Sequence, residues 1–91
     1  MVTVEEMKQY LRVDFPDDDS LLAVMIPSAE KLCASIARMP IEEFLSLKDE
    51  NAKTAVLYAV AYLYEHREEA DHHQLTIDLR SLLFGIRKEG F

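Results

Sequence analysis

The stretch AVLYAVAYLY, residues 55–64, places ten apolar residues in a row in a chain of 91 residues. A helix that is apolar on every side either spans a membrane or is surrounded by other helices. A membrane span needs about 20 apolar residues, twice the length of this run. We therefore expect residues 49–69 to form a central helix on which the rest of the chain packs, with no membrane involved.

The composition favours a small helical domain. Ala, Leu and Glu are common, and glycine occurs only at Gly85 and Gly90, so helices joined by short links are expected. We predict an all-α fold, a small bundle of four to five helices around the central helix, with residues 1–91 forming one domain. Cys33 is the only cysteine, which excludes an internal disulfide, and we interpret it as a buried small hydrophobic residue.

Two further helices precede the central one. Thr3 and Glu6 form a capping box that starts a first helix, which ends at residues 12–16 before a proline. The acidic triplet at residues 17–19 is expected to cap a second helix and to oppose its dipole. Pro27 predicts a kink or a split in this second helix. Its core seam steps by three and four residues through Leu22, Met25, Ala29, Leu32, Ile36 and Met39.

A short helix and a last helix complete the predicted bundle. Residues 41–47 predict a helical turn with Pro40 near its start. Residues 66–73 are interpreted as a polar hinge, and the last helix is expected at about residues 77–88. Phe84 points away from the core face of that helix, which makes it a candidate for an exposed patch. The core face consists of Leu79, Leu82, Leu83 and Ile86.

No constellation in the sequence predicts catalysis. His66, His72 and His73 lie among acids, but their spacing matches no zinc pattern, and a solvated helix end explains them better. The acids at residues 17–19 lack the turn glycine and the glutamate of a calcium loop. No glycine-rich loop is present, and no serine has a neighbouring histidine in the sequence. We therefore predict no enzyme activity, no metal site and no cofactor.

The charge argues against nucleic-acid binding. The net charge is −7, and the only adjacent basic pair is Arg87 and Lys88. Binding to phosphate requires a basic face that displaces counterions, and no such face is visible. The tyrosines of the central helix, Tyr58, Tyr62 and Tyr64, are expected to span from core to surface, because a buried hydroxyl needs a hydrogen-bond partner.

Four segments occur in an order that resembles the phage head–tail connector family, the gp6-like group. They are TVEEMKQYLRVD, DDDSLLAVMIPSAEKL, AVLYAVAYLYEHREE and LRSLLFGIRKEGF. The resemblance implies an all-α subunit that assembles with copies of itself into a ring beneath the portal protein of a tailed phage or prophage. Such a ring extends the DNA channel, lets DNA pass without specific binding, and offers a docking surface to a downstream connector or stopper protein.

The implied role is structural and places the chain in the virion, at the head–tail junction, after assembly in the cytoplasm of the bacterial host. We expect contacts with another subunit or the portal to involve Leu83, Phe84, Ile86 and Phe91. A small acidic helical adaptor or regulator that binds one protein partner is the alternative. Composition and charge alone do not separate these two functions. A ligand-binding or enzymatic bundle is a third, weaker possibility.

Overall fold

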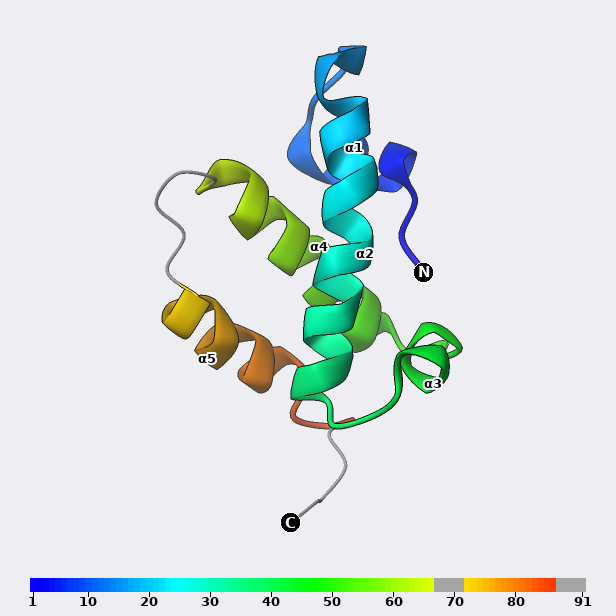
Figure 1. Cartoon of the computed structure of the whole chain (residues 1–91), viewed down its shortest axis with the longest axis vertical. Helices are drawn as coiled ribbons and strands as arrows, with labels where there is room; N and C mark the ends of the chain where they lie inside the picture. The colour runs from blue at the N-terminus through cyan, green and yellow to red at the C-terminus, as the bar shows by residue number, and fades with distance from the viewer. Residues whose placement is uncertain (67–71, 87–91) are drawn as a thin grey trace.

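The computed structural model describes residues 1–66 and 72–86, which form a bundle of five α-helices without a β-strand among them (Figure 1). The predicted all-α fold is confirmed. A short 3-10 helix, η1 (Pro16–Asp18), leads directly into the second α-helix. The α-helices are α1 (Val4–Leu11), α2 (Asp19–Ile36), α3 (Ile41–Leu45), α4 (Glu50–Glu65) and α5 (His72–Leu82).

Helix α4 is the centre of the bundle, as its apolar sequence predicts. It packs against α1, α2 and α5. Small residues make this close packing possible, because Ala52, Ala55 and Ala59 have no exposed surface and let the neighbouring helices approach. The helix ends at Glu65, four residues before the predicted end at residue 69. His66 lies in a turn, and residues 67–69 are outside the described residues.

Helix α1 begins at the predicted capping box. The Thr3 Oγ1 atom accepts a hydrogen bond from the amide of Glu6 at 3.1 Å, and the Glu6 carboxylate accepts one from the amide of Thr3 at 3.1 Å. Met7 points into the core with no exposed surface. The helix ends at Leu11 and is followed by the C-cap residue Arg12, whose backbone is left-handed with a φ of 59°, so the predicted end is confirmed.

Helix α2 is continuous through Pro27, so the predicted possibility of a split is wrong. A proline in a helix cannot donate to the carbonyl four residues earlier, here that of Ala23. Both Ala23 and Pro27 are exposed, so water can satisfy that carbonyl without any cost to the core. The core side of the helix is buried at Leu22, Ile26, Ala29, Cys33 and Ala34, and the seam residues Met25, Leu32 and Ile36 are half-buried.

The acidic triplet lies at the start of α2, where Asp19 in the first turn opposes the helix dipole as predicted. Asp18 is the N-cap residue of α2, but its side chain makes no capping hydrogen bond. Its carboxylate instead accepts a hydrogen bond from the hydroxyl of Tyr64, which lies near the end of α4. Asp19 forms an ion pair with Lys8, whose Nζ atom is 2.9 Å from Oδ1. These acids therefore connect the start of α2 to α4 and α1.

Helix α5 begins at residue 72, earlier than the predicted residue 77, so residues 72 and 73, which were predicted to belong to the polar hinge, are helical. The cause is Leu75, which has no exposed surface and extends the apolar stripe of Leu79 and Leu83 by one turn toward the start of the helix. After Leu82 the chain continues as turns over residues 83–86. Residues 87–88, where the helix was predicted to end, are outside the described residues.

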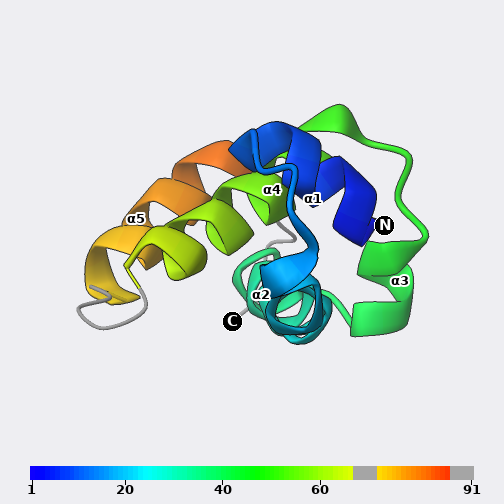
Figure 2. The ribbon, with the colours of Figure 1, turned by 90° about the horizontal axis from the view of Figure 1, so that it is seen from above.

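The bundle is thin, with extents of 43 × 28 × 17 Å. An α-helix with its side chains is about 10 Å across, so the thickness accommodates two layers of helices. Figure 2 shows α1, α4 and α5 on one side and α2 on the other. In both views α3 and α5 lie at opposite edges of the molecule (Figures 1 and 2).

Candidate assembly interface

The four residues predicted to form an interface have different environments in the structure. The Phe84 side chain is 78% exposed, the highest value among the large apolar residues that are described. Ile86 is half-buried. Leu83 has no exposed surface, because it lies four residues after Leu79 on the inner side of the helix, and it is therefore a core residue of the subunit. Phe91 is outside the described residues. Of the predicted residues that the structure describes, Phe84 and Ile86 have surface accessible to another protein, and their role in an interface stays a prediction.

Phe84 belongs to a wider exposed face that the sequence-based prediction missed. Ile77 is 43% exposed, and its side chain lines the same hollow as Phe84, which lies two residues after the end of α5. Arg80 and Ser81 are exposed between them, and the four residues line a shallow hollow of about 290 Å³. We call this set, Ile77, Arg80, Ser81 and Phe84, the α5 outer face. The seven-residue spacing opposite the leucine stripe was the signal in the sequence that could have identified it.

The opposite side of α5 fixes the direction of this face. Leu75, Leu79 and Leu83 are fully buried in the core. Beside them, the Tyr58 hydroxyl on α4 donates a hydrogen bond of 2.7 Å to Oδ2 of Asp78. These contacts set the rotation of α5 about its own axis. The α5 outer face is therefore held pointing away from the bundle.

Asp78 is the polar residue of α5 that binds α4. Its second carboxylate oxygen accepts a hydrogen bond of 3.0 Å from the Gln74 side-chain amide, one turn earlier on the same helix. The hydrogen bond to Asp78, together with burial, raises the pKa of Tyr58 above its ordinary value. The phenol therefore remains a hydrogen-bond donor to a higher pH than an ordinary tyrosine does.

The other two tyrosines of α4 also follow the prediction that they span from core to surface. Tyr62 and Tyr64 are half-buried. Tyr64 donates to Asp18, as described above. The Tyr62 ring stacks on the His66 ring, with 4.3 Å between ring centroids, and His66 Nδ1 is 3.0 Å from the Tyr62 carbonyl oxygen. His66 therefore closes the end of α4, as a solvated helix end would.

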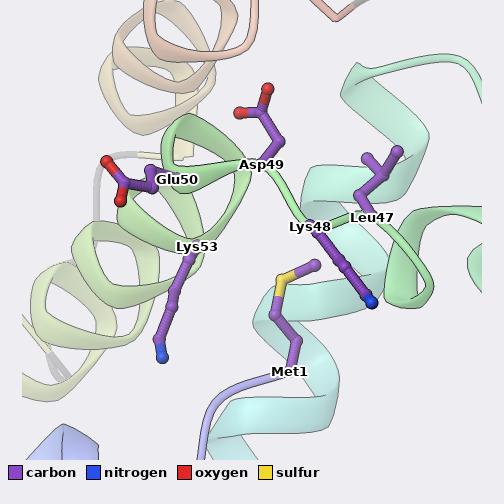
Figure 3. Close-up of a pocket in the computed structure, with 6 residues that line it drawn as sticks. All are labelled: Met1, Leu47, Lys48, Asp49, Glu50 and Lys53. Atoms are coloured by element: carbon purple, nitrogen blue, oxygen red, sulfur yellow. The ribbon is translucent and has the colours of Figure 1, made fainter.

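A second hollow, of about 370 Å³, lies where the N-terminal segment meets the start of α4 (Figure 3). Two of its charged side chains already have structural partners. Asp49 caps α4 by accepting a hydrogen bond of 3.1 Å from the amide of Ala52. Lys53 forms an ion pair with Glu6, and this contact, followed by the hydrogen bond from the Thr3 amide, lowers the pKa of Glu6. The lining residues are Met1, Leu47, Lys48, Asp49, Glu50 and Lys53.

The described part of the chain contains no group of three or more His, Cys, Asp or Glu side chains that could hold a metal ion. Cys33 is fully buried, and burial, reinforced by the charge of Glu30, raises its pKa to about 12. The interpretation of Cys33 as a small core residue is confirmed. None of the helices in residues 1–66 and 72–86 is both long and apolar enough to cross a membrane.

The thin helical bundle leaves Phe84 and Ile77 exposed around one shallow hollow, which is a candidate surface for contact with another protein. The model of the family described as phage gp6-like head-tail connector protein matches residues 1–88, and the chain therefore belongs to this family. It has the role of a structural connector protein of a phage, which makes it a virion component. The sequence has no match among curated proteins, and no solved structure matches the chain.

Proposed function

We propose that the chain, as one domain of residues 1–91, forms a homo-oligomeric ring that docks on the portal protein and extends the DNA channel of a tailed phage or prophage. The ring also presents a surface to a downstream connector or stopper protein. The observation that carries this proposal is the α5 outer face. A phenylalanine that is 78% exposed on the same side as a half-exposed isoleucine leaves apolar surface for another protein to cover.

The charge of the chain suits a channel through which DNA slides. Each lysine or arginine that contacts a phosphate releases counterions and strengthens binding. With 17 acids against 10 basic residues, the chain offers few such contacts. We therefore expect an assembled ring not to bind duplex DNA in a gel-shift assay. The assay uses about 0.1 M salt, at which interactions between charges are only partly screened.

The experiment compares the mass of three purified chains over a range of concentrations, by light scattering coupled to size exclusion, with and without portal protein. The wild-type chain is expected to form a large species of defined mass. Phe84→Asp is expected to stay monomeric, because a carboxylate cannot be buried in an apolar contact without a partner. Phe15→Asp is the matched control, since Phe15 is also an exposed aromatic residue, 50% accessible, outside α5.

Two results would contradict the proposal in different ways. If Phe84→Asp forms the large species and supports head completion as well as the wild type does, the α5 outer face is not an assembly surface. If the wild-type chain is strictly monomeric at every concentration, also with portal present, ring formation itself is wrong. A monomer that binds one other protein would then favour the adaptor function.

A further inference from the structure

We infer that the α5 outer face of one subunit binds the α3 edge of the next copy, so that neighbouring subunits in the ring meet head to tail. The α3 edge is the exposed side of α3, formed by Glu42, Leu45 and Ser46. This inference rests on the proposed ring, and it adds the identity of the surface that receives α5.

The two surfaces lie where a ring requires them. Helices α3 and α5 lie at opposite edges of the thin bundle in two perpendicular views (Figures 1 and 2). A ring with more than two members requires each subunit to use two different surfaces, one for each neighbour. A contact between two α5 outer faces would use one surface twice and would end at a dimer. Surfaces at opposite edges allow the chain of contacts to continue.

The α3 edge has the same construction as the α5 outer face. Phe44 is fully buried and anchors α3 to the bundle. On the side of the helix away from Phe44, Leu45 is 41% exposed, and Glu42 and Ser46 are exposed beside it. The Ser46 hydroxyl donates a hydrogen bond of 2.7 Å to the Glu43 carbonyl and so closes the short helix. An exposed apolar residue thus lies beside a carboxylate.

The chemistry of the two surfaces is complementary. On α5, Ile77 and Phe84 flank Arg80, whereas on α3 the apolar Leu45 lies beside Glu42. Neither Arg80 nor Glu42 takes part in an ion pair with the residues that the structure describes. A guanidinium group can bind a carboxylate through two parallel hydrogen bonds, which adds geometric specificity to an apolar contact.

Electrostatics also favours this pairing. Copies of a chain with a net charge of −7 repel one another, so association needs a local meeting of opposite charges. The segment IEEFLSLKDE, residues 41–50, carries four acids and one lysine. The α5 outer face carries Arg80 as its only charged residue. The α5 outer face, with its single positive charge, therefore meets a segment in which acids outnumber basic residues by four to one.

A mixing experiment tests the head-to-tail contact directly. Phe84→Asp removes the α5 outer face but leaves the α3 edge intact, and Leu45→Asp does the opposite. Each variant alone is expected to be monomeric, with self-association weakened by about 30-fold or more, as for a central interface residue. Mixed in equal amounts, the two variants are expected to form a heterodimer and nothing larger, because only one working contact remains. Val24→Asp, on exposed surface of α2, is the control and should assemble as the wild type does.

A charge reversal gives an independent test that does not depend on the apolar substitutions. Arg80→Glu and Glu42→Arg should each weaken assembly, and the chain carrying both changes should recover it. Far-UV circular dichroism and melting curves of every variant verify that the subunit is folded.

The outcomes separate this inference from the proposed ring. If Phe84→Asp prevents assembly while Leu45→Asp assembles like the wild type, the ring stands and the α3 edge is not the receiving surface. The same conclusion follows if the double charge reversal does not restore assembly. If the wild-type chain forms no ring even with portal present, both the ring and this inference are overturned.

Discussion

Removing the Tyr58 hydroxyl measures how much the polar contact between α4 and α5 adds to the leucine packing. The hydroxyl donates a hydrogen bond of 2.7 Å to a carboxylate oxygen of Asp78. Hydrogen bonds to charged groups contribute about 1.5–3 kcal/mol when buried, and this one is only half-buried, so we expect Tyr58→Phe to lower the free energy of unfolding by about 1–1.5 kcal/mol. For a domain of this size that corresponds to a fall of roughly 4–12 °C in Tm.

The assay is urea and thermal unfolding followed by far-UV circular dichroism, at a concentration where the chain is monomeric. Tyr10→Phe is the control, because Tyr10 is 46% exposed and the substitution should change stability by less than about 0.5 kcal/mol. A cycle with Asp78→Asn isolates the pairwise energy between the two side chains. If Tyr58→Phe and Tyr10→Phe have equal effects, or if the cycle gives no coupling, the hydrogen bond does not hold α5 in place.

The pH dependence of the same contact has a defined direction. The folded state raises the pKa of Tyr58, so it binds the phenolic proton more tightly than the unfolded chain does. The stabilisation is therefore complete below the unfolded pKa of about 10 and is lost as the pH rises through the higher folded value. The stability difference between wild type and Tyr58→Phe should shrink across that alkaline range, and a difference that stays constant would contradict the assignment.

Three further outcomes are expected. Leu79→Ala, at a fully buried position, should cost about 2–4 kcal/mol in urea unfolding; a loss below 1 kcal/mol would mean that α5 is not part of the core. Burial and the charge of Glu30 raise the pKa of Cys33 to about 12, so the thiol should not react with a thiol reagent at neutral pH until the chain is unfolded. Immediate reaction of the native chain would contradict the burial of Cys33. The ion pair with Lys53 lowers the pKa of Glu6, so the stabilisation from ionised Glu6 is present above the ordinary pKa of 4.5 and is lost as the pH falls through the lower pKa of the folded state. Glu6→Gln should therefore make the free energy of unfolding depend less on pH in the acidic range. An unchanged acid dependence would refute the ion pair.

The parts of the fold that depend on local chemistry could be predicted from the sequence. The capping box at Thr3 places the start of α1, because its hydrogen bonds join residues only three positions apart. The ten-residue apolar run identifies the central helix without knowledge of its neighbours. The parts that depend on distant partners could not be predicted. Asp18 was expected to cap α2, but it accepts a hydrogen bond from Tyr64, which is 46 positions away.

The distinction between local chemistry and distant partners also separates what could and could not be predicted about the candidate interface and the helix ends. The sequence was sufficient to predict the exposure of Phe84, because its spacing places it opposite the leucines, although the helix itself ends at Leu82. Pro27 was expected to disturb α2, yet which face of a helix a proline occupies depends on the tertiary packing, and here it faces solvent. The start of α5 was placed too late because Leu75 lies beyond a polar segment and shows its role only when it packs in the core. Local patterns therefore identified the helices, and packing decided their ends.

The small thickness of the bundle, 17 Å, has a consequence for any assembly built from it edge to edge. If subunits meet through α3 and α5 at the two edges, the two broad sides of the bundle become the inner and outer walls of such an assembly. Each wall is then a single layer of helices, and the apolar core of the subunit lies between the two layers. A label attached at Val24 on α2 would then report from one wall, and a label on the exposed side of α1 from the other.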